Sequence, residues 1–168
     1  MLGRRTRGKF SGAVGAYNAL SLLFDDPESV EREVLAELGI EPAQHSTQIV
    51  PPEALMRLLH EIVLAMGIMA NLADDMRHLA RPEIGEVSEA FGAEQVGSST
   101  MPHKRNPIHF ERIKSFWKIV MPRYTTVLMD QISEHQRDGT NLASSRTYPE
   151  ILAYAVLAAR EATEMMRG

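Results

Sequence analysis

The sequence contains no cysteine, a single tryptophan and few aromatic residues of any kind, 6% in all. Without cysteine the chain can form neither a disulfide nor a thiolate zinc site. No stretch reads as an apolar run of the length that a membrane span needs. The basic residues among the first nine positions are not followed by the apolar block of a signal peptide. These absences predict a protein without disulfides, thiolate-bound metal, a membrane segment or a secretory leader. We therefore expect a cytoplasmic protein.

The residues that are present are typical of a globular protein. The chain has 168 residues, of which 44% are hydrophobic and 24% charged, enough for one domain with a hydrophobic core. Its formal net charge of −4 argues against general affinity for nucleic acids. We therefore expect a single domain over residues 1–168.

Apolar residues recur at helical spacing along most of the chain. The pattern predicts long helices joined by short connectors, an all-α bundle. Asp26 with Pro27 predicts a capped helix start, and Gly39 its end. Pro122 is expected to kink or interrupt the helix in which it lies. The expected helices cover residues 10–24, 27–38, 52–79, 107–132 and 149–166, with a connector at 40–50 and a turn or extended segment at 83–91.

Residues 97–107 read Gly-Ser-Ser-Thr-Met-Pro-His-Lys-Arg-Asn-Pro. The small residues can expose their backbone amides, and Lys104 and Arg105 add positive charge. Asn106 and Pro107 are typical of an N-cap and a first-turn proline, so a helix should start here. A loop of this kind at a positive helix N-terminus suits an anion. The alternative is a polar surface loop before a capped helix, and composition alone does not separate the two.

The same string resembles the signature loop, residues 92–107 here, of the fumarase/aspartase superfamily. His103 and Arg105 resemble its adenylosuccinate lyase and carboxymuconate cycloisomerase branches. Three further segments resemble the adenylosuccinate lyase branch: residues 9–15, the strip Ser46-Thr47-Gln48, and residues 134–138 together with Arg146. The resemblance implies the long-helix bundle of that superfamily's central domain plus a C-terminal helical part.

The resemblance also implies roles for individual residues. It makes Ser98 the general base, Lys104 the group that polarises a substrate carboxylate, and Glu111 the partner that orients a catalytic histidine. It requires no metal or organic cofactor. The residues it assigns to substrate binding are Thr47, Gln48, Ser99, Met101, Asn106, Arg137 and Arg146.

The reaction implied is a β-elimination, in which a base removes a proton beside a carboxylate and leaves a dianionic carbanion. Such an intermediate needs cations and hydrogen-bond donors arranged in advance. Serine is a poor base at its ordinary pKa and becomes effective only where positive charge and amide donors outweigh desolvation. Lys104 and the loop amides can supply these, and a second group must protonate the departing atom.

The chain departs from the family pattern in two ways. Leu142 stands where the family has a serine five residues after its first arginine, with Ser144 and Ser145 as nearby substitutes, and Gly139 is unusual there. None of the six histidines matches the family's general acid, which belongs to an N-terminal portion that we expect to be absent. The chain alone should therefore have weak or no activity and need a separate N-terminal half.

Three functions remain open at this point. The first is adenylosuccinate lyase-like release of fumarate from adenylosuccinate, giving AMP, and from the succinyl-aminoimidazole-carboxamide ribotide of purine synthesis. The second is the reaction of a carboxymuconate cycloisomerase or another lyase of the superfamily. The third is a non-catalytic helical oligomerisation fragment. The wide apolar helix faces predict a homo-oligomer, and the resemblance implies a tetramer.

Overall fold

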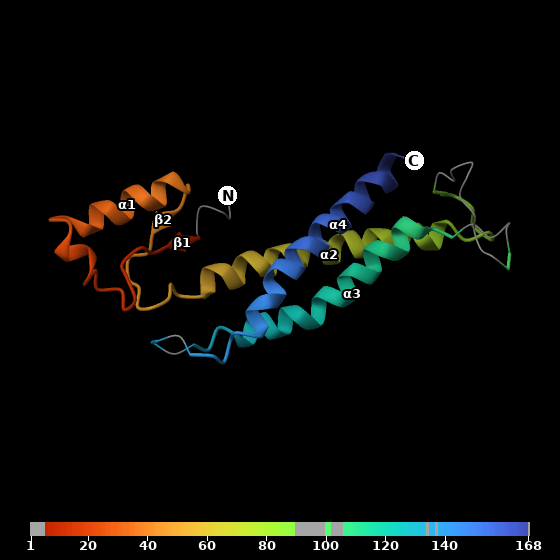
Figure 1. The fold of residues 1–168 in the computed structure, drawn as a ribbon. Helices are drawn as coiled ribbons and strands as arrows, with labels where there is room; N and C mark the ends of the chain where they lie inside the picture. The colour runs from red at the N-terminus through yellow and green to blue at the C-terminus, as the bar shows by residue number, and fades with distance from the viewer. Residues whose placement is uncertain (1–5, 90–99, 102–105, 134, 137, 168) are drawn as a thin grey trace. The chain divides into compact units, whose positions relative to one another are not determined.

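A computed structural model describes residues 6–89, 100–101, 106–133, 135–136 and 138–167. The chain divides into two compact units. The first comprises Met1–His60 and Thr125–Tyr148, and the second comprises Glu61–Tyr124 and Pro149–Gly168. The described residues are mostly helical (Figure 1), which confirms the predicted all-α class.

In the first unit, helix α1 (Pro27–Glu37) forms as the sequence predicts. The Asp26 carboxylate caps it by accepting from the backbone N–H of Ser29 at 3.0 Å. The helix ends before Gly39, whose φ of +66° is a conformation that glycine adopts at little cost. Strands β1 (Arg7–Gly8) and β2 (Glu41–Pro42) pair in parallel, with Arg7 opposite Glu41.

The helix expected over residues 10–24 is wrong. This segment consists of turns and a short 3-10 helix at Leu20–Leu22. Gly12, Gly15 and Tyr17 all have positive φ, between 53° and 82°, which an α-helix cannot contain. The glycines that weaken the helical pattern therefore serve a different purpose, a folded turn that packs on the connector at 40–50.

Three long helices follow, and their bounds agree with the prediction within three residues. They are α2 (Glu53–Leu79), α3 (Ile108–Met129) and α4 (Thr147–Arg167). Helix α3 begins one residue later than the cap pattern predicts, with the Pro107 carbonyl accepting from the Glu111 N–H at 3.0 Å. It also runs through Pro122, so of the two alternatives expected there, a kink or an interruption, the interruption is wrong. Residues 81–86 form turns and bends and residues 87–89 are irregular, in agreement with the turn or extended segment predicted at 83–91, whose last two residues lie outside the described part of the chain.

The core of the second unit is built from all three of these helices. Ala70 and Ala73 of α2 pack with Phe110 and Ile113 of α3 and with Ala162 of α4. Trp117 lies beside this cluster, and its indole nitrogen is 3.3 Å from where a Cβ on Gly67 would stand. The small residues allow the helices to approach closely, as expected for tightly packed helices.

The composition of helix α2 differs from the expectation that no stretch is apolar enough to span a membrane. It is long and apolar enough to cross a membrane, with a mean hydropathy of 1.5 over its most apolar 18 residues, of which 28% are buried. The expectation that no stretch is sufficiently apolar is therefore wrong. Core helices of soluble proteins have the same length and composition, so this helix by itself does not indicate a membrane protein.

Candidate active site

The strip Ser46-Thr47-Gln48 is held in place by Lys9. The Lys9 ammonium donates to the backbone carbonyls of Thr47 at 2.6 Å and Gln48 at 2.9 Å, and to that of Gly12 at 2.6 Å. An ammonium has three N–H groups, so all of its donors are used. Lys9 thereby joins the turn at residues 9–15 to the strip, two segments that the resemblance picks out separately.

Two further contacts join the same segments. The hydroxyls of Ser11 and Ser46 lie 3.0 Å apart, and Ser11 is almost fully buried. Gly15 approaches the strip so closely that a Cβ there would clash with the carbonyl oxygens of Ser46 and Thr47. The turn at residues 9–15 thus acts as a support for the predicted substrate-binding strip.

Thr47 connects this strip to the segment that follows α3. Its hydroxyl donates to the backbone carbonyl of His135 at 2.7 Å, across 88 residues of sequence. The structure therefore brings the Ser-Thr-Gln strip beside the arginine-containing segment, as a shared site requires. The Thr47 hydroxyl proton is already committed to the protein, which leaves only the lone pairs of its oxygen for a ligand.

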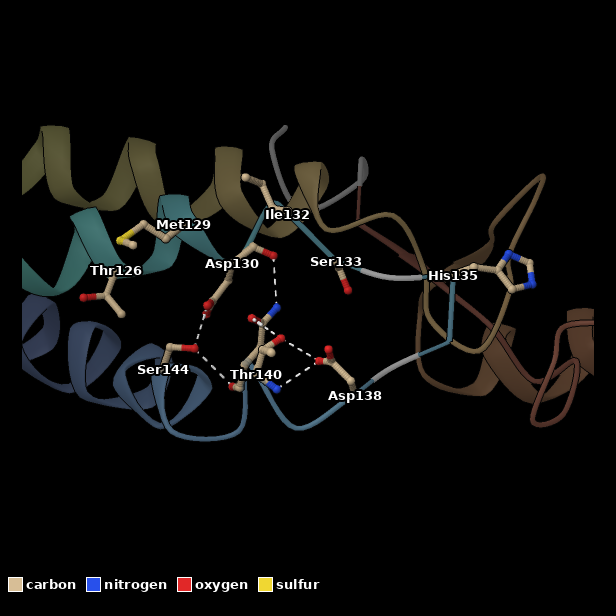
Figure 2. A pocket seen from close by; sticks show the side chains of 10 residues that line it. Thr126, Met129, Asp130, Ile132, Ser133, His135, Asp138, Thr140 and Ser144 are labelled. Carbon is tan, nitrogen blue, oxygen red and sulfur yellow. Dashed lines mark hydrogen bonds between the residues drawn. The ribbon is translucent and has the colours of Figure 1, made fainter.

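Asp130, directly after α3, anchors the far end of that segment (Figure 2). Its carboxylate is 5% exposed and accepts from the hydroxyls of Ser144 and Tyr148, each at 2.6 Å. Its backbone carbonyl accepts from the side-chain amide of Asn141 at 3.3 Å. The hydroxyl of Ser144 therefore donates to Asp130, and that of Ser145 donates to the Leu142 carbonyl, which leaves only the lone pairs of each oxygen for a ligand.

An open pocket of about 640 Å³ lies against this segment within the first unit (Figure 2). It is large enough for a small molecule of nucleotide size, and eight of its ten lining residues have polar side chains. Its lining residues are Thr126, Met129, Asp130, Ile132, Ser133, His135, Asp138, Thr140, Asn141 and Ser144. None of the predicted site residues that the structure describes lines it, although Thr47 contacts His135 at its edge.

The structure describes only part of the predicted site. Met101 and Gln48 are exposed, Asn106 is half-buried before α3, and Glu111 is exposed in the first turn of α3. Arg146 is exposed in the 3-10 helix Ser144–Arg146. The remaining predicted site residues, Ser98, Ser99, Lys104 and Arg137, lie outside the described residues.

Among the histidines, His45, His60, His78 and His135 are exposed. His109 lies on α3, with Nδ1 2.5 Å from a carboxylate oxygen of Glu161 in the second unit. It is therefore paired with a carboxylate of α4. Among the described residues, no cluster of three or more histidines and carboxylates could hold a metal ion.

Hydrogen bonds shift two ionisations in the first unit. The hydrogen bond from the Tyr17 hydroxyl to Glu31 is the main cause that raises the pKa of Tyr17 to about 12, followed by burial. Glu31 is itself buried, and it also accepts from the backbone N–H of Phe10. The hydroxyl of Thr140 holds the pKa of the Asp138 carboxyl below its usual range, with help from the Thr140 backbone N–H.

Sequence reasoning misses Lys9 and Asp130 as supports of the site. Lys9 lies within a segment that the resemblance singles out, but nothing in its spacing indicates which carbonyls it reaches. Asp130 follows an amphipathic helix that ends just before it, where a carboxylate is ordinarily a solvated residue. Its burial depends on hydroxyls 14 and 18 residues further along the chain, which no local pattern reveals.

Helices packed around small residues, with polar loops at their ends, define the class of protein as an all-α bundle. Comparison with a solved structure identifies the fold within that class. The chain is similar to 3-carboxy-cis,cis-muconate lactonizing enzyme from Pseudomonas putida, with a TM-score of 0.79 and 28% identity, over 95% of this chain and 35% of that one. The fold is therefore that of the fumarase/aspartase superfamily.

Residues 1–121 match the family model described as Lyase, and the chain belongs to that family. Curated relatives named adenylosuccinate lyase agree. Those from Pyrococcus abyssi and Aquifex aeolicus are 37% and 40% identical over 139 residues, 83% of this chain and 30% of each relative. The relative from Archaeoglobus fulgidus is 35% identical over 160 residues, 95% of this chain and 35% of its own length. The chain thus spans about one third of the length of these relatives.

Proposed function

We propose that this chain supplies the base-bearing and anion-binding part of an adenylosuccinate lyase-type active site. The reaction is the β-elimination of fumarate from adenylosuccinate, giving AMP, and from the related succinyl-aminoimidazole-carboxamide ribotide. The observation that carries the proposal is the hydrogen bond from Thr47 to the His135 carbonyl. It joins two segments that are remote in sequence and that the proposed chemistry needs in one place.

In this proposal Ser98 removes the proton from the carbon beside a substrate carboxylate, and Lys104 stabilises the resulting dianion until the departing nitrogen is protonated by a second group. Thr47, Gln48, Ser99, Met101 and Asn106 contact the substrate. Arg137 and Arg146 bind its phosphate or carboxylate groups, for which bidentate guanidinium groups are well suited. Glu111 orients a histidine.

In this proposal the general acid is not among the residues of this chain. Four described histidines are exposed and His109 is paired with Glu161, so none is held as a buried acid aimed at the strip. We propose that the acid comes from another part of the assembled enzyme and that the chain alone turns over substrate weakly or not at all.

We further propose a cytoplasmic homo-oligomer, a tetramer by analogy with the superfamily. Support comes from apolar side chains that helix α2 leaves uncovered at helical spacing. Leu64, Ile68 and Leu72 are 52%, 64% and 40% exposed, and such a stripe is more apolar than a solvated helix face requires. A partner helix is its proposed cover. No metal, organic cofactor, nucleic acid or membrane takes part.

A second candidate is the chemistry of a carboxymuconate-type enzyme, favoured by the solved structure that the chain resembles. The two differ in their ligands, because only the purine reaction uses a nucleotide. Thermal unfolding of the chain with AMP separates them, since a ligand that binds only the folded state raises the melting temperature.

The proposal predicts that AMP raises the melting temperature and that 3-carboxymuconate does not. Protection by 3-carboxymuconate alone would favour the second candidate and overturn the first. Adenosine, which lacks the phosphate, is the matched control ligand, and it should protect less than AMP. Protection by neither nucleotide nor muconate, in a folded oligomer, is the outcome that favours a non-catalytic oligomerisation piece.

A further inference from the structure

The buried carboxylate of Asp130 has no part in the chemistry proposed above, yet it lies among residues that surround a predicted substrate-binding arginine. It is one of three buried polar side chains in the described part of the chain, with Ser11 and Glu31. Burying an ionised carboxylate is costly unless hydrogen bonds compensate it. The residues that donate those hydrogen bonds therefore indicate which part of the structure the buried carboxylate holds in place.

Both oxygens of the carboxylate are compensated by residues that flank Arg146. One accepts from the Ser144 hydroxyl and the other from the Tyr148 hydroxyl, each at 2.6 Å. Ser144 and Arg146 are the first and last residues of a single-turn 3-10 helix. Arg146 is thus fixed on both sides, two residues before and two residues after, by one carboxylate.

The backbone around Arg146 is fixed in the same way. The Asn141 side chain donates to the Asp130 carbonyl at 3.3 Å, and the Asn141 carbonyl accepts from the Ser145 N–H at 3.0 Å. The Arg146 guanidinium itself is exposed and forms no ion pair with the described residues. The arrangement is a fixed backbone that carries an uncommitted cation, which is what an anion-binding arginine requires.

We propose that Asp130 is a positioning residue for Arg146, acting through the hydroxyls of Ser144 and Tyr148. This inference rests on the proposed function, because it takes Arg146 as a group that binds the substrate's phosphate or carboxylate. Asp130 does not touch the ligand. Asp130 fixes the position from which the Arg146 guanidinium reaches the ligand. The two hydroxyl donors compensate the charge of the Asp130 carboxylate.

The test uses the full chain and AMP as the probe, with affinity measured by calorimetry at a temperature where every variant is folded. Tyr148→Phe removes one donor and keeps the ring, so it is the gentlest change, and Asp130→Asn is the second. Each should weaken AMP binding about fivefold to tenfold, which is within the range for the loss of one ordinary hydrogen bond. Tyr154→Phe, on the same helix in the second unit, is the matched control and should leave the affinity unchanged.

A double-mutant comparison separates positioning from mere stability. In an Arg146→Ala background, Tyr148→Phe should have no further effect on AMP affinity, because the residue it positions is gone. Hydrogen exchange at the amides of 144–146 should accelerate in Asp130→Asn and in Tyr148→Phe, but not in Tyr154→Phe. A lower melting temperature with unchanged AMP affinity, additive effects in the double variant, or unchanged exchange would each overturn the inference.

Failure of the proposed function gives a different result. The unchanged chain would then bind neither AMP nor fumarate, and the inference would fall with the function on which it rests. Arg146→Ala could instead weaken AMP binding relative to the unchanged chain while Tyr148→Phe and Asp130→Asn leave it unchanged. In that case the proposed function stands and only the positioning role of Asp130 is overturned.

Discussion

The hydroxyl of Thr47 donates to the backbone carbonyl of His135 at 2.7 Å, and this single bond spans 88 residues of sequence. It links the strip held by Lys9 to the segment anchored by Asp130. Each of these segments is irregular, so neither has a ladder of backbone hydrogen bonds to fix its place. The bond therefore contributes to the geometry of the candidate site as well as to stability.

Replacing Thr47 by valine tests this link, because the side chain keeps its shape and loses the donor. The free energy of unfolding should fall by about 1 kcal/mol, and somewhat more if the His135 carbonyl is left without a partner. Urea unfolding measures the change. Thr163→Val is the matched control, since the Thr163 hydroxyl bonds only to the carbonyl one turn earlier in its own helix. Equal losses in the two variants would contradict a special role for Thr47.

Lys9→Met should destabilise the chain by about 2 kcal/mol, since hydrogen bonds from a charged donor are stronger than neutral ones. Three carbonyls lose their shared donor, although water can reach some of them. Hydrogen exchange should also accelerate in the strip at residues 46–48. Lys118→Met, at an exposed position on α3, is the control and should change stability by less than about 0.5 kcal/mol. An unchanged strip in Lys9→Met would show that the lysine is not its support.

Gly15 and Gly12 form a matched pair that separates backbone strain from contact. Both have positive φ, 75° and 82°, so alanine at either should cost roughly 1–2 kcal/mol. At Gly12 a Cβ meets nothing within 4 Å, whereas at Gly15 it meets the Ser46 and Thr47 carbonyls. Gly15→Ala should therefore lose clearly more stability in urea unfolding than Gly12→Ala. Equal losses would mean that the turn does not press against the strip.

The raised pKa of Tyr17 predicts that the free energy of unfolding falls at alkaline pH. The hydrogen bond to Glu31 raises its pKa to about 12 in the folded chain, while an unfolded tyrosine ionises near pKa 10. Above about pH 10 the unfolded state therefore binds fewer protons than the folded state, so the free energy of unfolding falls as the pH rises toward 12.

Denaturant unfolding at a series of alkaline pH values measures this loss, and phenolate absorbance follows the ionisation itself. Tyr17→Phe should lower stability at neutral pH, where the hydrogen bond is intact, and should show a shallower decline above pH 10. Tyr154→Phe should keep the full decline. A decline of the same slope in Tyr17→Phe would place its origin in another group.

The sequence predicts the parts of this fold that repeat locally. The apolar periodicity of α2 and the cap of α1 at Asp26 each arise from residues within a few positions of one another, so their bounds agree closely with the structure. The turn at residues 9–15 could not be found in this way. The alanines and leucines of the surrounding residues 10–24 favour a helix, and only the contact of Gly15 with a strip more than 30 residues away requires the observed conformation.

The candidate site also has a part that the sequence predicts and a part that it does not. Its chemistry-bearing residues are recognised because they form contiguous strings, as in the loop that contains Ser98 and Lys104. The residues that hold the strings in place, Lys9 and Asp130, act on carbonyls and hydroxyls distant in sequence. Such contacts are tertiary, and a single sequence carries no pattern for them.

Fumarate release from adenylosuccinate tests the central claim most directly. The 160 matched residues of this chain replace their counterparts in the adenylosuccinate lyase of Archaeoglobus fulgidus, so that the relative supplies the general acid, and absorbance follows the reaction. The account predicts turnover by this chimaera, a fall of about 10²–10⁴-fold in Ser98→Ala, and no fall in the exposed control Ser88→Ala. A folded chimaera that releases no fumarate, or one whose turnover is indifferent to Ser98→Ala, would contradict it.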